Sequence, residues 1–244
     1  MSAMILDRNL VLEAVRVTEA AAIAAWGLAG RGNEHAADQV AVDAMRTALN
    51  SLDIQGVIVI GEGERDEAPM LYIGEKVGTG RGPRIDIALD PLEGTTLTAK
   101  AMGNALAVMA WAPAGTLLQA PDTYMDKIGC GPGFPDGVIN LDASAADNVR
   151  AVAKAEGCDP SEVTVCVLDR PRHAEIIASL RTVDARIYLI TDGDIAGVIH
   201  TADPSTGIDL YIGQGGAPEG VLACAALKCV GGQVQGRLMF RSSD

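Results

Sequence analysis

The sequence predicts an α/β fold, and three observations indicate it. Aromatic residues make up only 3% of the 244 residues, whereas all hydrophobic residues make up 48%, so the core must consist mainly of aliphatic side chains. Short β-branched runs without a polar interruption are typical of strands buried on both faces. After about residue 140 the pattern alternates between strand and helix, as in layered α/β domains. We therefore expect a mostly parallel sheet covered by helices.

The first half of the chain predicts two helices followed by strands. Apolar residues recur at helical spacing over residues 10–28 and about 36–49. Asp7 is a candidate cap for the first helix, and Gly30 and Gly32 end it. The expected strands, from β-branched or alternating patterns, lie at residues 56–60, 84–90, 104–112 and 116–119.

The second half repeats strand and helix units. Helices are expected over residues 143–155, 173–180, 195–200 and 218–227, and strands over residues 163–168, 186–190 and 232–240. This change of pattern divides the chain into a first α/β layer, residues 1–140, and a second one, residues 141–244. No repeat or linker separates them, so we expect the two layers to pack closely.

Charge and composition exclude several classes of partner. The chain has 32 acidic and 19 basic residues, a net charge of −13, which repels nucleic acid and anionic lipid surfaces. No export signal is visible at the N-terminus, and the longest apolar stretch is too short to span a bilayer. Five cysteines stand at spacings that match no zinc or redox template. We expect a cytoplasmic protein with reduced thiols that binds neither nucleic acid nor membrane.

The most informative segment is residues 90–96, Asp-Pro-Leu-Glu-Gly-Thr-Thr. A strand ending at Asp90 and a turn set by Pro91 would bring the carboxylates of Asp90 and Glu93 close together, as Mg²⁺ or Mn²⁺ requires. The residues that follow would offer backbone N–H groups to a phosphate. The alternative is an ordinary strand-exit turn with both acids in solvent.

A second acidic segment follows the first expected strand. Glu62, Glu64 and Asp66 stand where a sheet presents its ligands, and acids this close repel each other unless a cation offsets their charge. Taken alone, such a segment is more often a solvated loop. Two acidic strand ends in one domain favour a shared metal site. Asp38, on the second helix, is a weaker candidate because an isolated helical aspartate usually faces water.

Three segments of the second half are candidates for binding an anionic substrate. Residues 169–173, Asp-Arg-Pro-Arg-His, place two guanidinium groups after a strand, and residues 192–194, Asp-Gly-Asp, could accept hydrogen bonds from sugar hydroxyls. Residues 213–220 form a glycine-rich entry to a helix, where Glu219 could add a metal ligand. The alternatives are a basic surface turn, a helix cap and a flexible turn, respectively.

Together these motifs resemble the class II fructose-1,6-bisphosphatases, members of the lithium-sensitive, metal-dependent sugar phosphatases. The resemblance lies in residues 60–74, 90–95, 120–125, 169–173, 191–194 and 215–220, which occur in the order of the family. It implies a layered α-β-α-β-α sandwich, in which the C-terminal part of the second layer is shortened because relatives continue beyond residue 244. It also implies a homo-oligomer, either a dimer or a tetramer.

The resemblance further implies hydrolysis of the 1-phosphate of fructose-1,6-bisphosphate, in gluconeogenesis, by metal-activated water. The implied ligands of Mn²⁺ or Mg²⁺ are Asp38, Glu62, Asp90, Glu93 and Glu219. The implied substrate contacts are Glu93, Gly94, Thr95, Tyr124, Arg170, Pro171, Arg172, Asp192, Gly193, Asp194 and Gly216. Thr95 would hold the attacking water, and Asp38 or Asp66 would take its proton.

Three other functions fit the same motifs. The chain could also accept sedoheptulose-1,7-bisphosphate, or act on another phosphomonoester such as an inositol phosphate or a nucleotide 3′-phosphate, which substrate profiling would reveal. A phosphosugar-binding module without turnover is the non-enzymatic alternative. Tight binding without phosphate release would identify it.

Overall fold

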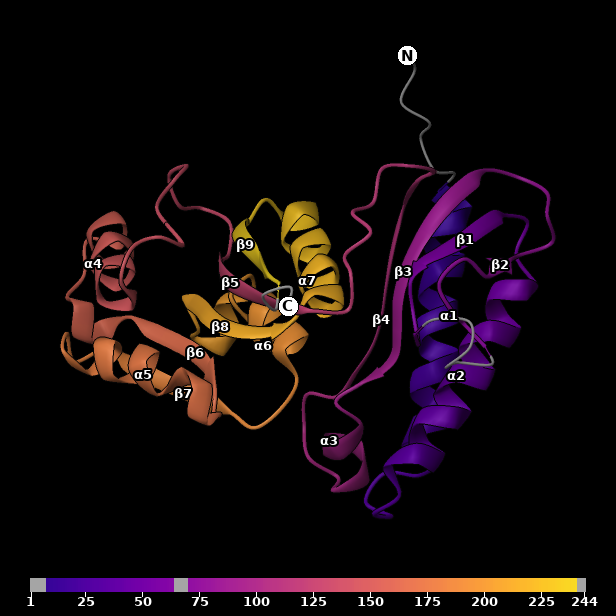
Figure 1. Cartoon of the computed structure of the whole chain (residues 1–244), viewed down its shortest axis with the longest axis horizontal. Helices are drawn as coiled ribbons and strands as arrows, with labels where there is room; N and C mark the ends of the chain where they lie inside the picture. The colour runs from indigo at the N-terminus through magenta and orange to yellow at the C-terminus, as the bar shows by residue number, and fades with distance from the viewer. Residues whose placement is uncertain (1–7, 64–69, 241–244) are drawn as a thin grey trace. The chain divides into compact units, whose positions relative to one another are not determined.

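The computed structural model describes residues 8–63 and 70–240 of the chain. The chain divides into two compact units, residues 1–120 and residues 121–244. Each unit contains one mixed β-sheet with helices packed on it (Figure 1). The α/β class expected from the sequence is therefore confirmed.

A pair of helices packs on the first sheet. α1 (Arg8–Trp26) and α2 (Glu34–Asn50) pack against each other and against β3 and β4 (Figure 1). α2 begins after Asn33, whose side chain accepts a hydrogen bond from the N–H of Ala36 at 3.0 Å. Such an N-cap satisfies one of the backbone donors that the first turn leaves unpaired.

The first sheet has the strand order β2-β1-β3-β4. Its strands are β1 (Gln55–Ile60), β2 (Lys76–Val77), β3 (Arg84–Glu93) and β4 (Leu106–Pro113). β1 and β3 are parallel, whereas β2 and β4 run antiparallel to their neighbours. The carboxyl ends of β1 and β3 consequently lie at the same edge of the sheet, next to the short helix α3 (Thr95–Ala99) that follows β3.

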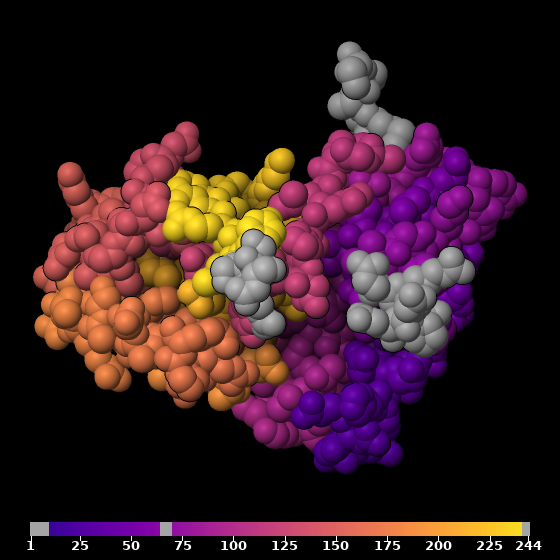
Figure 2. Space-filling view, in the orientation of Figure 1, coloured from indigo at the N-terminus to yellow at the C-terminus, as the bar shows by residue number. Residues whose placement is uncertain are grey.

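The second sheet has the strand order β7-β6-β8-β5-β9. Its strands are β5 (Tyr124–Cys130), β6 (Thr164–Leu168), β7 (Arg186–Ile190), β8 (Leu210–Gly216) and β9 (Gln233–Met239). The helices of this unit are α4 (Ala145–Glu156), α5 (Ala174–Arg181), α6 (Asp194–His200) and α7 (Ala217–Val230), with short 3₁₀ turns at Pro160–Glu162, Pro171–His173 and Pro204–Thr206. The edge strand β9 is largely exposed and contributes to the yellow surface of Figure 2.

Helices cover both faces of the second sheet. On β5, Ile128 belongs to a core cluster that includes Val149 of α4 and Leu180 of α5. A Cβ added at the next residue, Gly129, would meet Leu227 of α7 and Val198 of α6. Because successive residues of a strand point to opposite faces, α4 and α5 pack on one face and α6 and α7 on the other.

Most expected elements are present within a few residues of their predicted bounds, but three expectations are wrong. The sheets are mixed rather than mostly parallel, since only β1–β3, β6–β7 and β6–β8 are parallel pairs among the described strands. Residues 116–119 form no strand, because Thr116 closes a turn by donating from its N–H and its hydroxyl to the carbonyl of Pro113. The predicted strand 84–90 continues to Glu93, with an irregular register opposite β4.

Three strands were not predicted: the two-residue strand β2, and the strands β5 and β8. β5 carries Asp126 and Lys127 in its middle, which interrupts the apolar pattern of a central strand. β8 ends in a glycine-rich segment that is typical of a turn. The expected cap Asp7 lies outside the described residues. Within the described residues, no helix combines the length and the apolar character of a membrane span.

Candidate functional site

Three candidate carboxylates lie at or just beyond the carboxyl ends of the parallel strands β1 and β3. Glu62 comes two residues after β1, while Asp90 and Glu93 are among the last residues of β3. Glu93 is buried, with 6% of its surface exposed, and Asp90 is half-buried. Parallel strands present their carboxyl ends at one edge, so the strand order directs these residues to the same edge of the first sheet.

Pro91 shapes the segment between the two acids of β3. Proline has no N–H to donate to a ladder and occurs at irregular positions of strands. The pairing with β4 accordingly shifts register between Asp90 and Glu93. The Asp90 carboxylate accepts the N–H of Leu92 at 3.0 Å, which fixes the bend. Gly94 then adopts a left-handed conformation, with φ 83°, before Thr95 begins α3.

The carboxylate of Asp38, on α2, acts electrostatically on Glu62. Burial, and to a lesser extent the Asp38 carboxylate, raises the pKa of Glu62 to about 7. Burial also raises the pKa of Asp38 above its ordinary value. Two neighbouring carboxylates in a partly desolvated place repel each other, and a divalent cation would remove that repulsion. The donors are hard oxygens, so their chemistry fits Mg²⁺ or Mn²⁺.

Over residues 8–63 and 70–240, no three His, Cys, Asp or Glu side chains are grouped closely enough to hold a metal ion. Two of the expected acids, Glu64 and Asp66, lie outside these residues, so their place is not described. Of the proposed ligands, Asp38 and Glu62 are connected by their electrostatic interaction. The full set of metal ligands stays a prediction.

Glu75, a residue that the sequence analysis missed, links Arg46 of α2 to Leu71. Glu75 is 5% exposed, accepts a hydrogen bond from Arg46 Nε at 2.7 Å, and also accepts one from the N–H of Leu71. The carbonyl of Leu71 in turn accepts the N–H of Glu62 at 3.1 Å. A single acid between Gly74 and Lys76 gives no signal in a sequence, because its partner Arg46 comes from a distant position.

Replacing Glu75 by alanine is expected to lower the free energy of unfolding by about 2 kcal/mol, because Arg46 and the Leu71 N–H both lose their charged acceptor. Urea denaturation followed by circular dichroism measures the change. Arg81→Met is the matched control: its ion pair with Asp53 is exposed, so the unfolding midpoint should hardly move. Equal effects of the two substitutions would contradict the role given to Glu75.

Glu219 lies in the first turn of α7, the helix that directly follows the glycine pair at the end of β8. Its pKa is raised, chiefly by burial. Its Oε2 atom is buried and has no hydrogen-bond partner among the described residues. A Cβ at Gly216 would lie 1.8 Å from that atom, so the absence of a side chain there makes room for the carboxylate. A buried acceptor without a donor is a position that a cation would stabilise.

The basic segment after β6 is attached to β8 and β5. Arg172 donates from Nε and Nη2 to the carbonyl of Gln214, at 3.2 and 2.9 Å, and its guanidinium lies 5.2 Å from the ring centre of Tyr124. Arg172 and Tyr124 are both exposed, and Arg170 is half-buried. Thus Tyr124 and Arg172, two candidates far apart in the sequence, are brought together on one surface of the second unit.

His173 fixes this segment from beneath. It is fully buried; its Nδ1 bonds the carbonyl of Leu168 at 2.7 Å, and its Nε2 accepts the N–H of Gln214 at 2.8 Å. Because Nε2 accepts a hydrogen bond, the ring is neutral and carries its proton on Nδ1. Burial lowers the pKa of His173 below its ordinary value.

The second unit should therefore lose stability in mild acid. As the pH falls below about 6.5, the unfolded chain binds a proton at residue 173 before the folded chain does, so the free energy of unfolding decreases. Urea denaturation at pH 7.5 and 5.5 tests this. His173→Gln should reduce the difference between the two values, whereas His200→Gln, which leaves His173 in place, should preserve it. An unchanged pH dependence in His173→Gln would refute the assignment.

The remaining candidates are Pro171 and the three residues at the start of α6, Asp192, Gly193 and Asp194. Gly193 precedes Asp194 in a left-handed conformation, and Asp192 accepts the N–H of Gly193 at 3.1 Å. Asp194 is buried, and its carboxylate forms an ion pair with Lys127 of β5. Pro171 is exposed in the 3₁₀ turn after Arg170.

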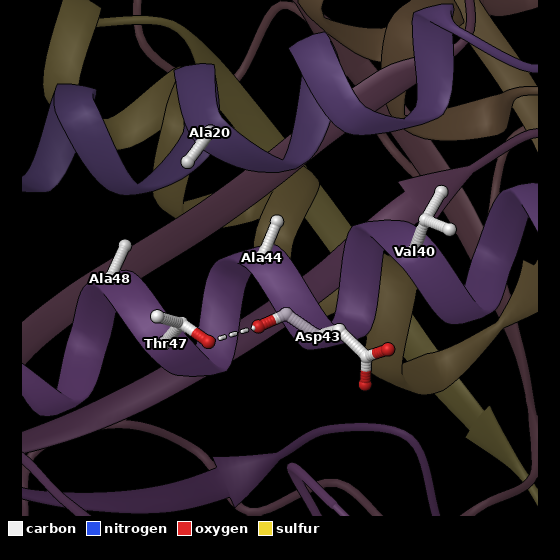
Figure 3. Close-up of a pocket in the computed structure, with 6 residues that line it drawn as sticks. All are labelled: Ala20, Val40, Asp43, Ala44, Thr47 and Ala48. Atoms are coloured by element: carbon white, nitrogen blue, oxygen red, sulfur yellow. Dashed lines mark hydrogen bonds between the residues drawn. The ribbon is translucent and has the colours of Figure 1, made fainter.

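A groove on α1 and α2 does not fit the expected substrate. Figure 3 shows Ala20 on one helix and Val40, Asp43, Ala44, Thr47 and Ala48 on the other. These residues offer mainly small apolar groups and the carboxylate of Asp43. A sugar bisphosphate needs cationic or N–H groups, so this groove is an unsuitable place for it.

Comparison with known proteins identifies the same family as the sequence motifs do. Residues 8–244 match the family described as bacterial fructose-1,6-bisphosphatase, glpX-encoded. Fructose-1,6-bisphosphatase 1 class 2 of Escherichia coli (strain K12) is 51% identical over 234 residues, which cover 96% of this chain and 69% of that protein. Fructose-1,6-bisphosphatase class 2 of Shigella flexneri has the same identity and coverage. This chain therefore belongs to the bacterial class II fructose-1,6-bisphosphatase family.

Proposed function

We propose that the chain hydrolyses the 1-phosphate of fructose-1,6-bisphosphate, giving fructose 6-phosphate and inorganic phosphate, as a step of gluconeogenesis. The observation that carries the proposal is the 51% identity to class 2 fructose-1,6-bisphosphatases over 96% of the chain. The acidic ends of β1 and β3 and the basic segment after β6 supply the two kinds of group that a metal-dependent sugar phosphatase needs.

The proposed metal ligands are Asp38, Glu62, Asp90, Glu93 and Glu219. The raised pKa of Glu62 and the buried, unpartnered Oε2 of Glu219 support this choice. Bound Mg²⁺ or Mn²⁺ would neutralise charge on the phosphate oxygens and lower the pKa of a water molecule. Because all donors are carboxylates, we expect these hard cations rather than a softer metal.

Four of the proposed substrate contacts have a clear chemical reason. Arg170 and Arg172 offer guanidinium groups to a phosphate. Asp192 and Asp194 can accept hydrogen bonds from sugar hydroxyls. The remaining proposed contacts are Glu93, Gly94, Thr95, Tyr124, Pro171, Gly193 and Gly216.

Side chains of the protein would orient the attacking water and accept its proton. The Thr95 hydroxyl would orient the attacking water, and Asp38 or Asp66 would accept its proton. The phosphoryl group passes directly to water, so no phosphoenzyme forms.

Phosphate release by the purified chain tests the function. The substrates compared are fructose-1,6-bisphosphate, sedoheptulose-1,7-bisphosphate, inositol 1-phosphate and a nucleoside 3′-phosphate, each with Mg²⁺ or Mn²⁺, with chelator, and with added Li⁺. We expect fastest release from fructose-1,6-bisphosphate, loss of release with chelator and inhibition by Li⁺. Faster release from another phosphomonoester, or binding of the bisphosphate without release, would overturn the proposal.

We also propose a cytoplasmic homo-oligomer, either a dimer or a tetramer. Free thiols at all five cysteines support a reducing compartment. Exposed apolar side chains on α1, including Leu12, Ile23 and Trp26, support contact with another subunit. Analytical ultracentrifugation measures the number of copies, and a single copy at micromolar concentration would refute the oligomer.

A further inference from the structure

A buried lysine joins three segments of the second unit. Lys127 lies in the middle of β5, and 2% of its side chain is exposed. Its Nζ atom forms an ion pair with the Asp194 carboxylate at the start of α6 and donates to the carbonyl of Gly216 at 2.9 Å. These partners are 67 and 89 residues away in the sequence.

The surroundings leave little freedom for the ion pair. The side chain of Lys127 is 2% exposed and that of Asp194 is 8% exposed, so water solvates neither charge well. A Cβ at Gly215 would lie 2.1 Å from Asp194 Oδ2 and 3.0 Å from Lys127 Nζ. Apolar residues could fill such a place at a lower desolvation cost. A charged pair that is retained in a core, against a glycine that makes room for it, suggests a role beyond packing.

We propose that Lys127 is a positioning residue for the sugar bisphosphate. It holds the Asp194 carboxylate by one oxygen and fixes the Gly216 carbonyl, so that two of the proposed substrate-binding segments keep one arrangement. Lys127 is too buried to contact the substrate itself, so it acts through Asp194. This inference rests on the proposed function, because that function makes Asp194 and Gly216 substrate contacts.

Lys127→Met tests the proposal, because methionine keeps most of the stem and removes the ammonium. Steady-state phosphate release gives KM and kcat. Titration calorimetry gives the affinity for fructose-1,6-bisphosphate in two separate titrations, one with chelator and one with Mg²⁺. We expect KM and the dissociation constant to rise by on the order of thirtyfold or more, with a smaller change of kcat. The control, Lys154→Met, removes an exposed lysine of α4 and should leave both values unchanged.

A double variant separates positioning from folding. Lys127→Met alone leaves Asp194 without its cation, whereas Lys127→Met with Asp194→Asn buries no net charge and should regain thermal stability. If Lys127 acts through Asp194, the double variant binds the bisphosphate as weakly as Asp194→Asn alone, within about threefold. The proposal would be overturned if the double variant lost affinity by the product of the two single losses. Wild-type affinity in a folded Lys127→Met chain would overturn it as well.

The calorimetric affinity keeps this test distinct from that of the proposed function. A wild-type chain that binds the bisphosphate without releasing phosphate would refute the hydrolysis but still let the affinities decide the role of Lys127. A wild-type chain that neither binds nor hydrolyses it would refute both.

Discussion

Glu93→Gln is expected to lower kcat for fructose-1,6-bisphosphate by about a thousandfold while the chain stays folded. Glutamine keeps the shape of the side chain but removes the negative charge that a divalent cation requires. Glu93 is 6% exposed at the end of β3 and is followed directly by Gly94 and Thr95, so its loss acts where the phosphate is proposed to bind. Phosphate release at saturating substrate and metal measures the effect.

The matched control for this prediction is Glu13→Gln. Glu13 is an exposed acid of α1 in the same unit, and its replacement should leave kcat unchanged. Circular dichroism melting of both variants checks that they are folded. A folded Glu93→Gln chain with kcat within about threefold of wild type would show that the proposed metal site is misplaced.

Gly61→Ala is expected to lower kcat/KM by about a hundredfold, although no candidate residue is changed. A Cβ at Gly61 would lie 2.1 Å from the carbonyl oxygen of Leu71 and 2.8 Å from a methyl group of Ile58. That same carbonyl accepts the N–H of Glu62. The backbone must therefore move, and the proposed ligand Glu62 moves with it.

Gly103→Ala serves as the comparison for Gly61→Ala. A Cβ at Gly103 meets no atom within 4 Å, and its backbone is not left-handed, so activity and melting temperature should stay near the wild-type values. Wild-type kcat/KM in Gly61→Ala would mean either that Glu62 is not a ligand or that the loop absorbs the clash.

The sequence predicts much of this architecture because local patterns determine it. The β-branched run before Glu62 and the alternating run before Asp90 identify β1 and β3, the two strands that direct acids to one edge of a sheet. The pairing of β5 with β8 and β9 is less accessible, because it depends on contacts between distant segments. Lys127 interrupts the apolar pattern of β5. Its ion-pair partner, Asp194, is 67 residues away in the sequence, so the pattern around Lys127 gives no sign of it.

The glycines of β8 were also misread, because their role depends on contacts with residues distant in the sequence. Gly213, Gly215 and Gly216 suggest a turn, yet they belong to β8. A Cβ at Gly213 would meet Tyr211 and His173, one at Gly215 would meet Asp194, and one at Gly216 would meet Glu219. The glycines are therefore explained by side chains that pack on the strand, which a single sequence does not reveal.

The most direct test of the account is ³¹P nuclear magnetic resonance of fructose-1,6-bisphosphate incubated with the purified chain and Mg²⁺. We expect the 1-phosphate signal to disappear while signals of inorganic phosphate and fructose 6-phosphate grow in equal amounts, and we expect chelator to stop the change. Loss of the 6-phosphate signal first, or equal turnover with chelator, would contradict metal-dependent hydrolysis of the 1-phosphate.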